Sequence, residues 1–286
     1  MIKRRFLNFL LIALLISCNT DEPIPAFIQV EEFNLVIDDE TLQGADSHEI
    51  TEVSVTAAGQ NIGIFSVPSE IPILEKGPTD VILSAVIKQD GQNDARVVYP
   101  FYNFHLSTPD LVSTETNQIT PDITYRDDLS FWPEDFDNSI SFNESVSSEG
   151  VFERTTDSEL IYGEDGASAV SVMEEGGLSF YAETQEGFSW PVGQPVFLEL
   201  DYSCDHIFSI GVLAVSGSEL TRGDLVAVIP TQNSAETNWR KLYINLTDFV
   251  FDNASAEFFE LYFRFNKSSA SDESNIYLDN LKVIHP

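Results

Sequence analysis

The chain has 286 residues, 43% of them hydrophobic and 12% aromatic, which is enough apolar material for the cores of about two domains. Its 47 acidic and 14 basic residues give a formal net charge of −33. Phosphate backbones and anionic lipid headgroups repel such a chain, which argues against nucleic-acid binding and peripheral membrane binding. The same charge attracts cations, calcium included.

The first residues predict export and attachment to a lipid. A basic start at residues 3–5 is followed by an apolar run at residues 6–16, which is shorter than the roughly 20 residues of a membrane-spanning helix. The run ends in Leu-Ile-Ser-Cys, which resembles the lipobox of bacterial lipoproteins. The resemblance implies a signal peptide at residues 1–17 and a lipidated Cys18. The alternative is an ordinary secretory signal with an incidental cysteine.

Residues 18–25 are predicted to form a short polar tether. Asp21 and Glu22 follow the cysteine closely, and this acidic pair resembles the surface-export signal of lipoproteins in Bacteroidota. The resemblance implies an outer-membrane lipoprotein that faces the cell exterior. An acidic pair is also common on solvated segments, so a periplasmic location stays open.

Residues 26–106 predict a small N-terminal β-sandwich. Apolar and polar residues alternate from Ile50 to Ala57, as in a half-buried strand, and turn residues follow. Asp90-Gly91 between two apolar runs predicts a hairpin. The run HEITEVSVTAAGQNIGIFSVP resembles the PEGA-like and transthyretin-like modules of surface lipoproteins. The resemblance implies a spacer or docking unit without catalytic residues.

Residues 107–128 are rich in Ser, Thr, Asp, Asn and Pro and show little apolar periodicity. We interpret them as a linker, or as a segment that wraps around a domain, with the domain boundary inside it.

Residues 129–286 predict a larger β domain, a sandwich or jelly roll, because strand-like runs recur without amphipathic helices between them. The predicted strands are Ala169 to Met173, Gly177 to Ala182, Val196 to Tyr202, Phe208 to Val215, Asp224 to Ile229, Trp239 to Leu246, Phe258 to Phe265 and Asn275 to Ile284. The last part of the domain contains WRKLYINLTDF, FFELYFRFN and SNIYLDNLKVI. These runs resemble the closing strands of galactose-binding-like jelly rolls, the scaffold of many carbohydrate-binding modules.

The same resemblance implies a structural calcium ion as the only cofactor. Asp279 stands where such domains place a calcium ligand on the closing strand, with Asp137 or Glu144 as partners. Calcium needs about seven oxygen ligands. The alternative is that Asp279 is only a strand-end residue.

Trp190 is the predicted ligand-binding residue, because glycan-binding proteins stack sugar rings on exposed aromatic side chains. It lies in an expected loop, Gly187 to Pro191, ahead of a strand. A core position is the alternative, since most tryptophans are largely buried. Trp132 is expected to pack the two domains together, and Trp239 to lie in the core.

The sequence does not favour an enzyme. It has no HExxH zinc motif, no GxSxG and no glycine-rich phosphate loop. Glu199-Leu200-Asp201 begins the Glu-x-Asp-x-x-Glu strand that resembles laminarinase-type glycosidases, but Cys204 stands where the second glutamate belongs. Strand alternation predicts that Glu199 and Asp201 share a solvent face. Cys204 is expected to be a small buried hydrophobe.

These observations predict an all-β protein in which a small N-terminal β-sandwich precedes a jelly-roll β-sandwich. The predicted function is non-catalytic binding of a polysaccharide or other extracellular ligand by the C-terminal domain of a lipid-anchored surface protein. The alternative is an adhesion or assembly subunit that binds another envelope protein through its sheet edges or its N-terminal domain.

Overall fold

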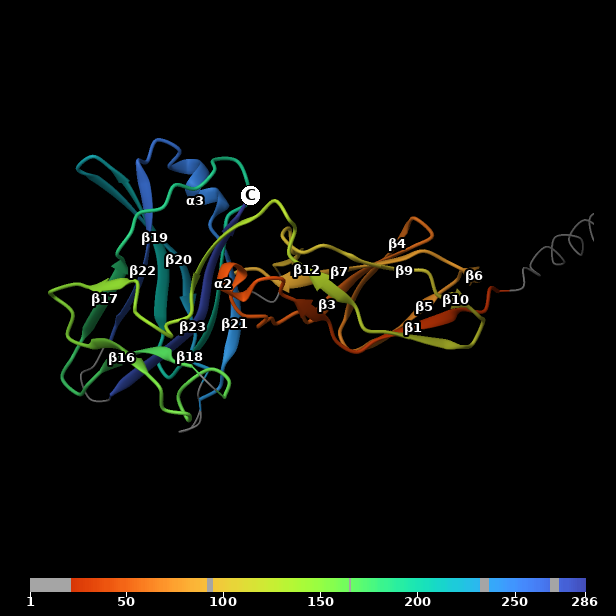
Figure 1. Ribbon diagram of the computed structural model, residues 1–286, viewed down its shortest axis with the longest axis horizontal. Coiled ribbons are helices and arrows are strands. Elements are labelled where there is room, and N and C mark those ends of the chain that lie inside the picture. Colours follow the sequence, from red (N-terminus) through yellow and green to blue (C-terminus); the bar gives the residue numbers. More distant parts are fainter. Residues whose placement is uncertain (1–21, 92–94, 165, 232–236, 268–272) are drawn as a thin grey trace, which may run out of the picture.

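The computed structural model describes residues 22–91, 95–164, 166–231, 237–267 and 273–286. The predicted signal peptide and Cys18 lie outside the described residues. Figure 1 shows an elongated N-terminal β domain beside a broader C-terminal β domain. The predicted all-β fold class is therefore confirmed. Within the described ranges, no helix is long and apolar enough to cross a membrane.

The N-terminal domain packs a sheet of order β4-β3-β7-β8, with β9 also paired to β7, against smaller sheets that contain β1, β2 and β5. Its strands bury alternate residues, as Val53, Val55 and Ala57 of β3 do, and these form the domain core. The predicted hairpin joins β7 and β8. The elements are β1 (Ala26–Val30), β2 (Asn34–Val36), α2 (Glu40–Gln43), β3 (Glu52–Ala57), β4 (Gln60–Ser66), β5 (Ser69–Ile73), β6 (Gly77–Pro78), β7 (Val81–Lys88), β8 (Arg96–Val98) and β9 (His105–Ser107).

The segment 107–128 belongs to the N-terminal domain. It contains β10 (Asp110–Leu111), β11 (Thr116–Ile119) and β12 (Asp122–Thr124). These strands pair with β6, β1 and β2 respectively. The linker prediction is therefore corrected, because short polar strands pair through their backbones and leave no apolar period in the sequence. Residues 107–128 instead match the alternative prediction, a segment that wraps around a domain.

The C-terminal domain is a β-sandwich of two sheets around one apolar core. The first sheet, called sheet E, has the order β15-β16-β23-β18-β21, with β13 also paired to β23; the second, called sheet G, has the order β14-β17-β22-β19-β20. The elements are β13 (Ser130–Glu134), β14 (Phe142–Glu144), β15 (Val151–Thr155), β16 (Ser168–Met173), β17 (Ser179–Thr184), β18 (Phe197–Cys204), β19 (Phe208–Ser216), β20 (Glu219–Val228), β21 (Arg240–Asn245), α3 (Thr247–Asp252), β22 (Phe258–Asn266) and β23 (Ser274–His285).

The two domains meet on the outer face of sheet E. Phe197, Tyr243 and Ile284 of the C-terminal domain are part of the N-terminal core. The hairpin turn of the N-terminal domain also bonds to β21: the Asp90 N–H donates to the Tyr243 carbonyl (2.7 Å), and the Asn245 N–H donates to the Asp90 carboxylate (2.9 Å). The domains thus share apolar packing and hydrogen bonds instead of being joined by a free linker.

Candidate functional site

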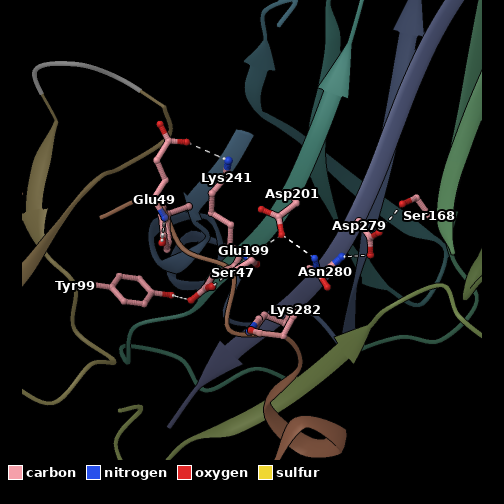
Figure 2. Close-up of polar contacts among 12 residues, drawn as sticks. Ser47, Glu49, Tyr99, Ser168, Glu199, Asp201, Lys241, Asp279, Asn280 and Lys282 are labelled. Atoms are coloured by element: carbon pink, nitrogen blue, oxygen red, sulfur yellow. Dashed lines mark hydrogen bonds and ion pairs between the residues drawn. The ribbon is translucent and has the colours of Figure 1, made fainter. Parts of the chain in front are cut away.

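A buried group of charged side chains lies where the N-terminal domain covers sheet E (Figure 2). Glu199 and Asp201 come from β18, Lys241 from β21 and Lys282 from β23. The Lys241 Nζ lies 3.7 Å from Glu199 Oε2 and 3.6 Å from Asp201 Oδ2. We call these four side chains the joint cluster.

The prediction that Glu199 and Asp201 face solvent is wrong. Their exposed fractions are 0% and 2%. Alternation along β18 does place both on the outer face of its sheet, but residues 45–49 and two tyrosines of the N-terminal domain cover that face. No pattern within a single strand can reveal a covering domain.

Hydroxyl and carbonyl groups of the N-terminal domain complete the joint cluster. The Tyr99 hydroxyl donates to Glu199 Oε1 (2.7 Å), and the Tyr125 hydroxyl donates to the same carboxylate (3.0 Å). Lys282 Nζ donates to the Ala45 carbonyl (2.7 Å), and burial lowers the Lys282 pKa to about 8. The partnered charges indicate a structural role at the domain junction.

The joint cluster does not offer a catalytic site. A glycosidase needs two carboxyl groups that flank a bound sugar, and a sugar cannot reach side chains this buried. Cys204 is buried as predicted, and burial raises its thiol pKa to about 12, so it carries no reactive thiolate.

Asp279, the predicted calcium ligand, is buried beside the joint cluster. Its carboxylate accepts hydrogen bonds from the Ser168 hydroxyl and from the Asn280 N–H (2.7 Å). It lines a cavity of about 630 Å³ together with Asp137, one of its two predicted partners, whereas Glu144 does not line that cavity. The cavity lies at the domain junction and is also lined by Glu40 of α2.

Several oxygen atoms around Asp279 accept hydrogen bonds from the protein itself. The Asp137 carboxylate accepts the Ala167 N–H (2.8 Å), and the guanidinium of Arg154 donates to the carbonyls of Phe136 and Asp137. The hydrogen bond of Ala167 goes to one of the two carboxylate oxygens of Asp137. Within the described ranges, no group of three or more His, Cys, Asp or Glu side chains is placed to hold a metal. Calcium binding stays a prediction from the sequence.

Asp279 should make stability depend on pH. Burial raises its pKa from 3.8 to about 7, so the native state holds a proton that the unfolded chain releases. Its contribution to the free energy of unfolding is complete below pH 3.8 and is lost as the pH rises through about 7. We expect Asp279→Asn to gain stability relative to the parent over this interval. Urea unfolding in EGTA at about pH 5 and about pH 7.5 measures the difference.

The control for this measurement is Asp110→Asn, at an exposed position of β10. An unchanged difference between parent and Asp279→Asn at the two pH values would mean that Asp279 does not titrate in this interval.

Trp190 is not an exposed platform. Only 6% of it is exposed, and its ring stacks on Phe188 (centroids 5.3 Å apart, planes at 8°) and on Phe259 (5.3 Å, 11°). Phe188 exchanges two backbone hydrogen bonds with Phe259, which holds the loop against β22. The prediction of a sugar-binding Trp190 is corrected to its alternative, a core residue. Trp132 packs on Phe188 within the same core instead of between the domains.

A pair of stacked tyrosine rings lies on the outer face of sheet G, with Tyr181 half-buried and Tyr262 fully buried beneath its neighbours. In β22, Phe259, Leu261, Phe263 and Phe265 point into the core, so alternation leaves Tyr262 and Arg264 on the outer face. Pairing with β17 places Tyr181 opposite Arg264. The Tyr181 and Tyr262 rings stack with centroids 5.5 Å apart and planes at 26°.

Gly211 and Arg222 both contact this ring pair. A Cβ atom at Gly211 would lie 2.3 Å from the Tyr262 ring, so only glycine leaves room for that ring on β19. The Arg222 guanidinium lies 4.9 Å from the Tyr181 centroid and 5.3 Å from the Tyr262 centroid, which are cation–π distances. Asp224 accepts from the Tyr262 hydroxyl and from Arg264.

Beside the ring pair is a cavity of about 310 Å³, which we call the sheet G cavity. Its lining combines hydroxyl, amide and guanidinium groups with one half-buried aromatic ring. The lining residues are Ser145, Ser147, Ser148, Ser179, Phe180, Tyr181, Arg222, Arg264 and Asn266.

The sequence contained part of the signal for this site. The alternation in FFELYFRFN allows Tyr262 and Arg264 to be placed on a face away from the core. It does not show that Tyr181 lies beside Tyr262, because that contact depends on the pairing of β17 with β22. Arg222 arrives from β20, on the far side of β19.

No known protein family and no curated protein matches the sequence. Distant likenesses among solved structures do exist. One is the CBM22-1 xylan-binding domain from Paenibacillus barcinonensis Xyn10C, with 11% identity, 54% of this chain and 92% of that chain covered, and a TM-score of 0.39. Another is the K1 cleaved adhesin domain of Lys-gingipain from Porphyromonas gingivalis, with 15% identity, coverages of 54% and 97%, and a TM-score of 0.39.

A third similar structure is a carbohydrate-binding module of the β-sandwich superfamily, with 15% identity, 80% of this chain and 83% of that chain covered, and a TM-score of 0.38. All three likenesses are far below the identity at which a ligand can be transferred between proteins. The identity of this chain's ligand must therefore be inferred from the residues of the chain itself.

Proposed function

We propose that this protein binds a glycan without catalysis, on the outer face of sheet G. The observation that carries the proposal is the sheet G cavity, where hydroxyl, amide and guanidinium groups lie beside the half-buried ring of Tyr181. Sugars present hydroxyl groups at their edges and C–H groups on their ring faces, and such a lining can contact both.

The carboxylates of this face support a binding role over a catalytic one. Glu183 and Glu260 lie on the outer face, but neither lines the sheet G cavity. The Tyr181 hydroxyl donates to Glu183 (2.9 Å), which holds that carboxylate against the ring pair. A hydrolase would instead place an acid and a second carboxylate on either side of the sugar-binding space.

The proposal includes lipid attachment at Cys18 and a cell-surface location. The sequence of the first eighteen residues supports it, as does the position of the first described residues. In Figure 1 the chain enters the N-terminal domain at the end far from the C-terminal sandwich. The N-terminal domain would then act as a spacer that holds sheet G away from the membrane.

Binding of residues 22–286, which include both domain cores, to a broad glycan panel tests the proposal. We expect at least one glycan to bind. Tyr181→Ala should lower the affinity for that glycan by about tenfold or more, which corresponds to about 1.4 kcal/mol, because the Tyr181 ring supplies the apolar contact. The matched control is Tyr162→Ala, a half-buried tyrosine outside sheet G that packs on Trp239. Equal binding by both variants would contradict the assignment of this face.

A protein partner is the second candidate, and one surface favours it. On the outer face of the N-terminal sheet, Ile64 and Leu106 are 52% and 56% exposed, and Phe104 next to β9 is 58% exposed. Strands β3 and β7 lie between Ile64 and Leu106, so these exposed apolar groups are spread over one sheet, and exposed apolar surface can mark a contact with another protein. A folded protein that binds no glycan in the panel would favour this candidate, an adhesion or assembly subunit of the envelope.

A further inference from the structure

We infer that the glycan carries anionic groups, uronate carboxylates or sulfate esters, and that Arg222 and Arg264 bind them in the sheet G cavity. The inference rests on the proposed function and names the class of its ligand.

The charge of the cavity lining is the first observation. Acidic residues outnumber basic ones in the chain by 47 to 14, so most of its surface repels anions. The residues that line the sheet G cavity include two arginines and neither Asp nor Glu. A positively charged site on a negatively charged protein favours a negatively charged ligand.

The position of Arg222 is the second observation. Stacking on Tyr181 and Tyr262 orients its guanidinium, and in the described part of the chain it forms no ion pair with a carboxylate. Its one hydrogen bond, from Nη2 to the Tyr181 hydroxyl, is long at 3.4 Å. Most of the N–H groups of a planar, oriented fork are therefore left for a ligand, and this fork matches a carboxylate or a sulfate.

Arg264 and the serines provide the remaining donors. Asp224 takes one Nη of Arg264, and among the described residues the buried Nε of Arg264 has no hydrogen-bond partner, so a ligand would meet the guanidinium through its outer nitrogen atoms. The hydroxyls of Ser145 and Ser147, 2.9 Å apart, lie on the same cavity and can donate to an anion or to sugar hydroxyls. Asp224 leaves Arg264 partly neutralised, so Arg222 is the main determinant of charge selection.

The decisive experiment compares glycans that differ only in charge. Polygalacturonate and its fully methyl-esterified form share a backbone, and chondroitin sulfate and its desulfated form separate sulfate from carboxylate recognition. We expect the more highly charged member of at least one pair to bind about tenfold or more tightly than its partner, with an affinity that falls as salt rises. Arg222→Gln should remove this preference.

Arg96→Gln is the control, because Arg96 is a half-exposed arginine of the N-terminal domain in an ion pair with Glu52. Equal affinity for the two members of both pairs, unchanged in Arg222→Gln, would overturn the inference and leave the proposed function standing. Binding to no glycan at all would instead overturn the proposed function, and the inference with it.

Discussion

Glu199→Ala is expected to lower the free energy of unfolding by about 3–5 kcal/mol, because it leaves buried cations without their counter-charge. Lys241 would keep Asp201 as an ion-pair partner but lose Glu199, and the hydroxyls of Tyr99 and Tyr125 would lose their acceptor. Urea unfolding followed by tryptophan fluorescence measures the loss.

The matched control is Glu153→Ala, at an exposed position of β15 in the same sheet. An exposed glutamate contributes little, so this variant should stay within about 0.5 kcal/mol of the parent. Similar small losses in both variants would show that the joint cluster does not stabilise the fold.

The second large effect is expected for Trp190→Ala. The indole fills the space between Phe188 and Phe259, and removing it leaves a cavity in the C-terminal core that should cost about 3–5 kcal/mol. Circular dichroism is the appropriate probe, since the substitution removes a fluorophore. Glycan binding by the fraction that remains folded should be unchanged, because Trp190 does not line the sheet G cavity.

Phe251→Ala provides the comparison for this variant. Phe251 lies in α3 and is 61% exposed, so its truncation should cost less than about 0.5 kcal/mol. Loss of glycan affinity in a fully folded Trp190→Ala protein would show that Trp190 takes part in binding. That result would contradict the placement of the site on sheet G.

The sequence predicts those parts of the fold that depend on patterns among neighbouring residues. The alternation in β22 predicts a strand with a buried and an open face, and Asp90-Gly91 predicts the hairpin between β7 and β8. Such signals depend only on neighbouring residues, which is why they also predicted the all-β class.

The candidate site on sheet G depends on contacts between residues distant in the chain. Tyr181, Arg222 and Tyr262 come together only through the pairing of β17, β19, β20 and β22. The burial of Trp190 has the same kind of cause, because the loop that carries it is hydrogen-bonded to β22. A loop position in the sequence says little about burial when another strand holds that loop in the core.

The place of β1 in its sheet has a mechanical consequence. β1 is the first described strand after the predicted tether, and it is held on one side by β11 and on the other by β5. A force that pulls a bound glycan away from an anchored chain would load both rows of hydrogen bonds along the strand direction, in shear. Rows of bonds loaded together resist far more tension than an edge strand whose bonds open one at a time. The segment at residues 116–119 would therefore act as a clamp on the strand that bears the load.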